Sequence, residues 1–343
     1  MTGEPIYIVG AGAIGGVLGA YLARGGLDVV LVDRARAHVD AINAHGLRIS
    51  GVRGDRTFAV PAITPDALPA TVRHVLLAVK AQHTVEALAP VATRLAPDGW
   101  VLSAQNGLCE EEIADVVGVE RTLGCFVHFG ADYQEPGHVL LANEAPLYVG
   151  EIDGVFTPRL RETAGALSLV VPTVQTDNVF GYLWAKLVYG VLAFAAALVD
   201  QPFGEVLGRP EDRDLYVAVA REVTSVARAH DVRLERFGGF EPARVDEGDE
   251  AAAAVIGGLA AASSGGLKAY TGIQRDLMVR KRPTEVNHQP GAIIAKGRSA
   301  GVATPWCDAI LDMIHEAERG VRPLGWANLD ELHRRAVGHR AGA

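Results

Sequence analysis

Three glycines near the start of the chain have the spacing that phosphate recognition requires. Residues 6–15 read IYIVGAGAIG, so an apolar run of strand type leads directly into Gly10, Gly12 and Gly15. In this pattern the first glycine permits a tight turn, the second lets backbone approach a pyrophosphate, and the third lets the next helix pack closely. The first N–H groups of that helix, at Ala13 and Ile14, face the anion. The pattern predicts a dinucleotide site, with a purely structural turn as the alternative.

The residues after the second predicted strand bear on which dinucleotide binds. An acidic residue at this place accepts hydrogen bonds from ribose hydroxyls and favours NAD, whereas an arginine accommodates the 2′-phosphate of NADP. Asp33 and Arg34 are adjacent here, and Arg36 follows. The motif therefore leaves both cofactors open, and a solvated surface is the simpler interpretation of the two arginines.

Two polar residues follow later apolar runs of strand type. Lys80 comes directly after residues 74–79, and Asn106 comes shortly after residues 99–103. The carboxyl ends of parallel strands are where α/β sheets bind ligands, so an amide and an amine there can contact a cofactor or a substrate. Surface or turn positions are the alternative for each residue.

One lysine lies inside a long apolar stretch. Lys186 interrupts residues 182–199, and a charge is expensive to bury in such a stretch unless it is paired. The lysine either extends its amine to solvent or acts as a general acid in a cleft. Glu285 lies in a Pro-Thr-Glu turn that resembles a helix start with Thr284 near the N-cap. The sequence alone gives Glu285 no chemical role.

Composition limits the class of protein. The 343 residues suffice for about two domains, and the net charge of −9 predicts no basic face for nucleic acid or an anionic membrane. The three cysteines have neither metal-ligand nor disulfide spacing, so we predict no metal site and a reducing cytoplasm. We expect no signal peptide, because the first predicted strand begins almost at Met1. The apolar run 187–199 is shorter than the roughly 20 residues of a membrane span.

The pattern of elements changes near residue 176. Before it, apolar strands at 6–9, 28–33, 74–79, 99–103 and 121–126 alternate with helices at 13–25, 38–45 and from about 84, and short strands follow at 139–141 and 147–149. After it, helices are predicted at 178–199, 211–231, 249–263, 268–280, 285–299 and 304–319. We predict an α/β fold: a Rossmann-type doubly wound sheet in residues 1–177 that binds the dinucleotide, and an all-helical domain in 178–343 for substrate and dimerisation. Residues 263–266 are predicted as a loop and 341–343 as a frayed tail.

Several short motifs, taken together in their order along the chain, resemble one known family, the ketopantoate reductases (2-dehydropantoate 2-reductases). The resemblance extends to about residue 320, and although each motif alone is weak, the ordered set is specific. The motifs are GAGAIGG at 10–16, VKA at 79–81, QNG at 105–107, WAKL at 184–187, RPTEV at 282–286 and GVATP at 301–305.

The resemblance implies a cytoplasmic reductase with a cleft between a Rossmann domain and a helical domain. Such enzymes use NADPH to convert a 2-oxo acid to a 2-hydroxy acid, and NAD stays an alternative here. Lys186 would be the general acid that protonates the carbonyl oxygen, and Glu285 would orient the substrate hydroxyl or the lysine. Asn106 would contact cofactor and substrate, and Lys80 would lie beside the cofactor.

Two positions depart from the family pattern. The family has asparagines one and two helical turns after the lysine, and this chain has Gly190 and Phe194 there. The family's serine before the glutamate motif has no clean match, and Thr271 is the nearest candidate. We therefore expect a divergent member with a larger, more apolar pocket, in which Gly190 opens room and Phe194 forms a wall, and a substrate other than ketopantoate.

Other functions stay open at this point. The chain could reduce an imine or a ketone that lacks a carboxylate, or it could bind NADP as a sensor without catalysis. The presence of both Lys186 and Glu285 argues against a sensor. The expected partner is a small carbonyl compound, and a homodimer is an alternative to a monomer.

Overall fold

The chain divides into two units, which contacts between residues assign to Met1–Val179 and Phe180–Ala343. The computed structural model describes residues 3–264 and 270–340. The domain boundary predicted from sequence lay between 177 and 178. The tail predicted as frayed, 341–343, and residues 265–266 of the predicted loop lie outside the described residues.

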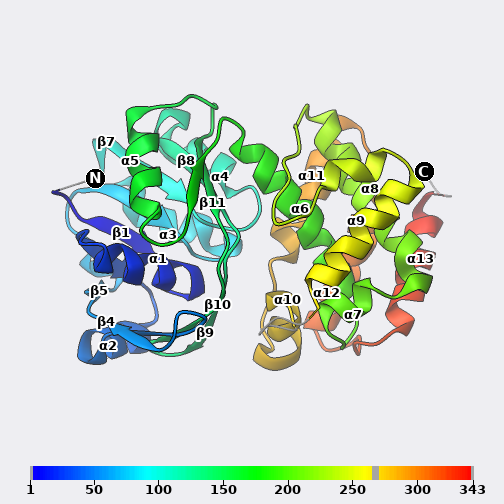
Figure 1. The fold of residues 1–343 in the computed structure, drawn as a ribbon, viewed down its shortest axis with the longest axis horizontal. Coiled ribbons are helices and arrows are strands. Elements are labelled where there is room, and N and C mark those ends of the chain that lie inside the picture. The colour runs from blue at the N-terminus through cyan, green and yellow to red at the C-terminus, as the bar shows by residue number, and fades with distance from the viewer. Residues whose placement is uncertain (1–2, 265–269, 341–343) are drawn as a thin grey trace. The chain divides into compact units, whose positions relative to one another are not determined.

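Unit 1, drawn in blue to green in Figure 1, is built on an eight-stranded sheet. The order of its strands is β12-β11-β8-β7-β6-β1-β2-β5. Six neighbouring strands, from β8 to β5, pair in parallel, and β11 pairs antiparallel to β8. The strands are β1 (Ile6–Val9), β2 (Val29–Val32), β5 (Ala62–Ile63), β6 (Val72–Leu77), β7 (Leu95–Ser103), β8 (Thr122–Val127), β11 (Leu147–Glu151) and β12 (Thr173–Gln175). The helices are α1 (Ala13–Arg24), α2 (Arg36–His45), α3 (Thr84–Ala92), α4 (Cys109–Val117) and α5 (Pro158–Leu167). The predicted parallel α/β domain is confirmed.

Burial on both faces of the sheet explains why its central strands are continuously apolar. Successive side chains of a strand point to opposite faces. Leu76 of β6 packs in a core with α1 and α5, whereas its neighbours Val75 and Leu77 pack in a second core with α3 and α4. Helices on both faces therefore bury the last three residues of β6, as parallel sheets require.

The chain reverses its direction across the sheet between β1 and β6. Strand β1 pairs with β2 on one side and with β6 on the other, all in parallel. The carboxyl ends of β1, β6 and β7 therefore meet at one edge of the sheet. In α/β proteins this edge, at the reversal point, is where ligands bind.

A second sheet in unit 1 was largely missed by the sequence prediction. Its order is β4-β3-β10-β9, with β3 (Leu47–Gly51), β4 (Arg56–Phe58), β9 (Gly130–Glu135) and β10 (His138–Asn143). Only β10 was expected. Its other strands carry exposed polar residues such as Arg48 and Arg56, so they lack the apolar run that identified the larger sheet. Helix α5 and strand β12 were also not predicted.

Unit 2 is helical, and within its described residues the β pairing is limited to one bridge between Phe237 and Phe240. Its helices are α6 (Val179–Ala196, whose first residue belongs to unit 1), α7 (Phe203–Leu207), α8 (Arg213–Ala229), α9 (Asp249–Ala262), α10 (Gly272–Arg275), α11 (Pro290–Ala300), α12 (Pro305–Glu318) and α13 (Ala327–Arg340). The sequence argued against a membrane span from the apolar run 187–199, but α6 begins before that run, at Val179. By length and composition alone, α6 could cross a membrane. However, 78% of it is buried in protein, as in the core helix of a globular domain.

Two predicted helices of unit 2 differ from the structure: one is interrupted, and one begins later. The stretch predicted as one helix at 268–280 contains the four-residue α10 and then a π-helical turn, Asp276–Arg280. Lys281 ends this turn with a left-handed backbone, at φ +50°. The helix predicted at 285–299 instead begins at Pro290, because proline fits the first helical turn but lacks the N–H of later positions.

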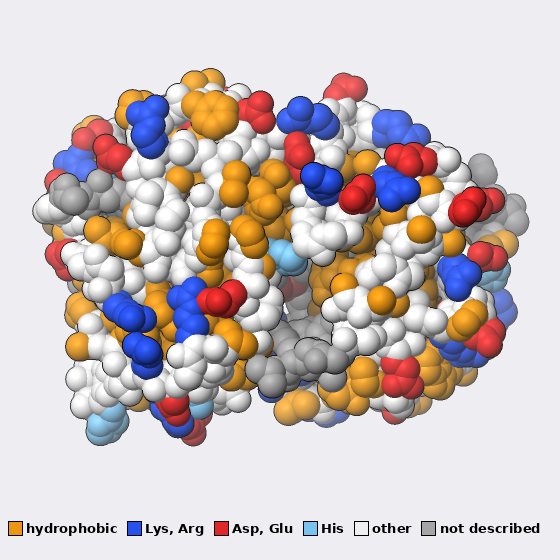
Figure 2. All heavy atoms as spheres, viewed as in Figure 1, with side chains coloured by type: hydrophobic (Ala, Val, Ile, Leu, Met, Phe, Trp, Pro, Cys, Tyr) orange, Lys and Arg blue, Asp and Glu red, His pale blue; other side chains and the backbone are white. Residues whose placement is uncertain are grey.

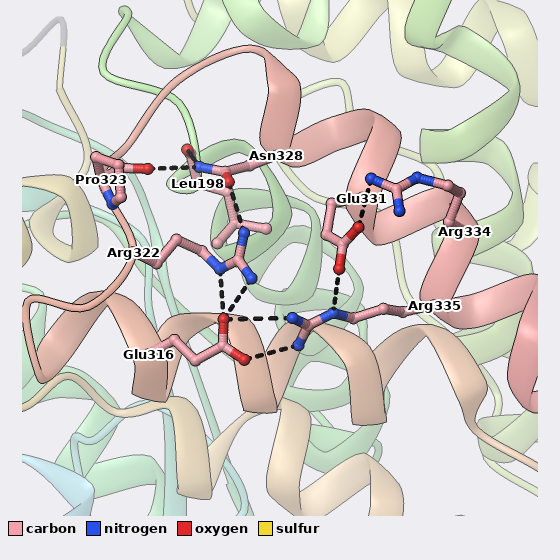
Figure 3. A network of polar contacts seen from close by, with 8 residues as sticks. All are labelled: Leu198, Glu316, Arg322, Pro323, Asn328, Glu331, Arg334 and Arg335. Atoms are coloured by element: carbon pink, nitrogen blue, oxygen red, sulfur yellow. Dashed lines mark hydrogen bonds and ion pairs between the residues drawn. The ribbon is translucent and has the colours of Figure 1, made fainter.

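Helix α13 was not predicted from sequence, and a polar network holds it against α12 (Figure 3). Arg335 of α13 donates to Glu316 of α12 at 2.8 Å, and Arg322 donates to the same carboxylate at 2.6 Å. Asn328 donates to the carbonyl oxygen of Leu198 at 2.9 Å. One carboxylate thus accepts from two guanidinium groups, which fixes the helix through charge-assisted hydrogen bonds.

Charged side chains of both signs are scattered over the surface seen in Figure 2, where blue and red groups alternate with uncharged ones. No large basic field appears on this face. The pattern agrees with the modest negative charge of the whole chain.

A buried carboxylate fixes the start of α12. Glu222 of α8 accepts the backbone N–H groups of Trp306 and Cys307 at 2.9 and 2.7 Å. These are donors that the first turn of a helix leaves without intrahelical partners. Burial disfavours the charged form and raises the pKa of Glu222 to about 7, although both N–H groups act in the opposite direction.

We expect Glu222 to make the stability of unit 2 depend on pH. Between its unfolded pKa and about 7, the folded state holds a proton that the unfolded state has lost, so stability falls as pH rises. The free energy of unfolding of the wild type, relative to Glu222→Gln, should fall by about 2–3 kcal/mol from pH 5 to pH 8. Urea unfolding followed by circular dichroism measures it. Glu250→Gln, on the exposed face of α9, is the control, and a constant difference between wild type and Glu222→Gln would contradict the assignment.

Candidate active site

The glycine-rich turn after β1 uses its three glycines for different reasons. Gly10 has φ +96°, and a Cβ there would lie 2.7 Å from the backbone nitrogen of Val79 after β6. A Cβ at Gly15 would lie 1.9 Å from the carbonyl oxygen of Gly10. At Gly12, by contrast, a Cβ would meet no described atom within 4 Å. Gly10 and Gly15 are required by the fold, whereas the open space at Gly12 fits the close approach of a pyrophosphate.

The N-terminus of α1 opens at this turn. Gly12 is the N-cap and provides no side-chain cap, and the first turn of α1 has no acidic residue. Helix geometry leaves the N–H groups of Ala13 and Ile14 without intrahelical acceptors. These groups and the helix dipole favour an anion, so the residues present fit a dinucleotide phosphate.

Two side chains hold the peptide groups of Ala11 inside this turn. The N–H of Ala11 donates to Asp33 Oδ2 at 2.9 Å, and its carbonyl oxygen lies 2.9 Å from His38 Nε2. His38 Nδ1 accepts the N–H of Gly137 at 2.9 Å, so the ring proton is on Nε2 and is donated to Ala11. His38 is 1% exposed and also links the turn to the β9–β10 connection. Sequence reasoning missed His38, because nothing in a short polar helix distinguishes it.

The structure gives Asp33 a role that was not predicted. Its second oxygen accepts the N–H of Ala35 at 2.8 Å, so both carboxylate oxygens are engaged by backbone. Arg34 is 63% exposed at its side chain and pairs with Glu86 at 3.3 Å, beside His83. Contact of Asp33 or Arg34 with a ribose stays a prediction.

Lys80 and Asn106 follow β6 and β7 at the sheet edge that also carries the glycine-rich turn. Both side chains are half-buried. Gln105 connects the two loops, since its Nε2 donates to the Val79 carbonyl at 3.0 Å and to Thr84 Oγ1 at 2.9 Å. The topology of unit 1 thus brings Gly10, Lys80 and Asn106 to one edge.

In unit 2, Lys186 is half-buried on α6 between the buried residues Ala185 and Leu187. Gly190 lies one turn later on the same face. The space expected above Gly190 is filled, because a Cβ there would lie 2.1 Å from Oε1 of Gln289. The reason is that the glycine lets a neighbouring carboxamide approach the helix backbone. The expectation of added room at this position is therefore wrong.

The other two residues predicted for the pocket, Phe194 and Thr271, each have a structural role in the fold. Phe194 is fully buried in α6. Thr271 caps α10: its hydroxyl accepts the N–H of Gln274 at 3.2 Å, and Gln274 Oε1 accepts the N–H of Thr271 at 3.0 Å. A contact of Phe194 or Thr271 with substrate stays a prediction.

Glu285 is 9% exposed and precedes a short 3-10 turn, Val286–His288, instead of standing in the first turn of a helix. The segment is held by Glu318 of α12, whose Oε1 accepts both the N–H and the hydroxyl of Thr284 at 2.7 Å. Sequence reasoning missed Glu318, which lies 34 residues away in the chain. Among the described residues, no group of three His, Cys, Asp or Glu side chains could hold a metal ion.

The two glycines of the turn give a matched pair of variants. Gly12→Ala should fold normally, because φ is −68° and no described atom is near, yet it should weaken NAD(P)H binding about tenfold or more by holding the backbone away from the pyrophosphate. Gly15→Ala should destabilise the protein by about 1–3 kcal/mol, because its Cβ meets backbone. Thermal unfolding and fluorescence titration separate the two effects. Unchanged nucleotide affinity in Gly12→Ala would place the pyrophosphate elsewhere.

The chain is similar to known reductases along most of its length. It is 34% identical over 231 residues to the 2-dehydropantoate 2-reductase of Pyrococcus horikoshii. The aligned residues cover 64% of this chain and 70% of that relative. It is 28% identical over 325 residues to the enzyme of the same name from Archaeoglobus fulgidus, which covers 94% of this chain and 100% of the relative.

Solved structures agree. A PanE/ApbA family ketopantoate reductase from Ralstonia eutropha superposes with a TM-score of 0.77 at 27% identity, covering 92% of this chain and 99% of the other. A complex of D-mandelate dehydrogenase with NADH gives 0.78 at 25% identity, with the same coverage. The family descriptions "Ketopantoate reductase PanE/ApbA" and its C-terminal counterpart match residues 6–154 and 178–318. The chain therefore belongs to the ketopantoate reductase family.

Proposed function

We propose that Lys186 protonates the carbonyl oxygen of a 2-oxo acid during its reduction to a 2-hydroxy acid, with NADPH as the preferred cofactor. The class of reaction follows from the family: the chain is an NAD(P)H-dependent oxidoreductase that acts on a CH–OH group. The observation that supports Lys186 most directly is a half-buried ammonium on an otherwise apolar helix, in the unit that lacks the glycine-rich turn.

The proposed step balances in electrons and protons. The glycine-rich turn would hold the dinucleotide, whose reduced nicotinamide would supply the hydride, and thus both electrons, for the carbonyl carbon. As negative charge develops on the carbonyl oxygen, the Lys186 ammonium stabilises that charge and transfers one proton to form the hydroxyl. Lys186 then regains a proton from solvent. Glu285, held by the Thr284–Glu318 contact, is proposed to orient the substrate or the lysine.

The proposed preference for NADPH depends on Arg34. Asp33, the residue that would accept a ribose hydroxyl of NAD, already accepts two backbone N–H groups. The pair between Arg34 and Glu86 is exposed, and such pairs contribute only about 0–1 kcal/mol, so a 2′-phosphate can displace the carboxylate. NADH is the alternative, and D-mandelate dehydrogenase, which shares this fold, has been solved in complex with NADH.

We further propose a cytoplasmic homodimer. A ketopantoate reductase from Staphylococcus aureus that shares this fold is named as dimeric. The proposed binding partner of each subunit is a small carbonyl compound.

Lys186→Ala should lower kcat by about 10²–10⁴-fold, because general acid catalysis contributes about that factor. Affinity for NADPH should stay within about twofold, and the fall of the wild-type rate at alkaline pH should disappear. Lys296→Ala, at a half-buried position on α11, is the matched control. Steady-state kinetics on a panel of 2-oxo acids, ketones and imines provides the measurement. A variant as active as the wild type would exclude Lys186 as the acid, and a wild type that binds NADPH without turning over any compound would indicate a sensor.

Arg34→Ala should weaken NADPH at least about tenfold and leave NADH nearly unchanged, since only the former carries the phosphate that the guanidinium would bind. Glu86→Gln should strengthen NADPH, because it removes the competing carboxylate. Dissociation constants for both nucleotides, measured by fluorescence titration, give the comparison. Equal losses for the two nucleotides in Arg34→Ala would refute this role.

A further inference from the structure

The carboxamide of Gln289 lies against α6 at Gly190, one helical turn after Lys186. Its Oε1 lies 2.1 Å from where a Cβ of Gly190 would stand. In an α-helix the Cα–Cβ bond tilts toward the N-terminus, so this place faces the preceding turn. Lys186 belongs to that turn, four residues earlier on the same face. The carboxamide therefore lies at the face of α6 that also carries Lys186, one turn away.

This carboxamide lacks the partners that buried amides normally have. Gln289 is 7% exposed, but no described residue hydrogen bonds to its side chain. The carboxamide atoms are not among the fully buried, unpartnered polar atoms of the described residues, so they reach solvent and are available to a ligand. Other buried glutamines of the chain are bonded: Gln274 donates to the carbonyl oxygens of Val199 and Gln201 at 3.3 and 2.6 Å.

We propose that Gln289 is a substrate-binding residue that donates a hydrogen bond to the carboxylate of the 2-oxo acid. In such a substrate the carboxylate carbon is bonded to the carbonyl carbon, so its oxygens lie close to the oxygen that Lys186 would protonate. A half-turn of the amide group presents its NH2, and a carboxylate is an acceptor that strengthens this bond. The inference rests on the proposed function and names the residue that selects an acid over a simple ketone.

The same contact accounts for the glycine at position 190. Any larger residue there would displace the carboxamide, because a Cβ at 2.1 Å from Oε1 is a clash. The amide that the family pattern places on α6 is thus delivered here from the segment before α11. The pocket keeps a polar group at this point, although it comes from another part of unit 2.

The test uses Gln289→Met, which keeps the volume of the side chain and removes the amide. For the best 2-oxo acid among phenylglyoxylate, 2-dehydropantoate and 2-oxoisovalerate, KM should rise at least about tenfold with kcat less affected. Reduction of trifluoroacetophenone, which lacks the carboxylate, should change less than about twofold. Oxamate binding to the protein–NADPH complex should weaken in parallel with KM. Asn287→Ala, an exposed amide of the same segment, is the control.

Gly190→Ala should cause the same selective loss by displacing Gln289, and Gly190→Asn combined with Gln289→Ala should recover part of the lost affinity. Thermal unfolding verifies that each variant is folded, and if Gln289→Met unfolds, Gly190→Ala and the double variant provide the answer. Unchanged KM in Gln289→Met, or equal losses for acid and ketone, would overturn the inference alone. A wild type that binds NADPH but neither reduces these acids nor binds oxamate would overturn the proposed function, and the inference with it.

Discussion

The backbone of Ala11, held at both its N–H and its carbonyl oxygen, fixes the glycine-rich turn of unit 1. Asp33 accepts its N–H and His38 donates to its carbonyl oxygen, so the turn between β1 and α1 is held from the second strand and from α2 at once. Neither bond uses the glycines, which only make room. The turn is fixed before any phosphate binds, and a rigid donor array loses less entropy on binding than a mobile one.

In unit 2 the corresponding support comes from carboxylates at the ends of α12. Glu222 accepts the first N–H groups of that helix, and Glu318 near its other end fixes Thr284 and so the position of Glu285. Helix α12 therefore connects α8 to the segment that carries Glu285, a proposed site residue. Glu285 thus has a defined position, which its proposed role in orienting the substrate or the lysine requires.

The sequence was most informative where local patterns decide structure. The glycine-rich turn, the apolar strands of the parallel sheet and the long helix around Lys186 were all predictable from runs of residues. What escaped prediction depends on contacts between distant segments. His38 meets Gly137 across 99 residues, and the filling of the space at Gly190 by Gln289 leaves no trace in either local sequence. A short π-helical turn and a helix held by arginine–glutamate pairs likewise lack a distinctive pattern.

The shared space between Gly190 and Gln289 also restricts how the chain can diverge. Because the two positions fill one volume, a side chain gained at 190 displaces the carboxamide of Gln289, whereas a shorter residue at 289 leaves room for it. The polar group at this place can therefore come from either element, and a substitution at one position changes what the other position can hold.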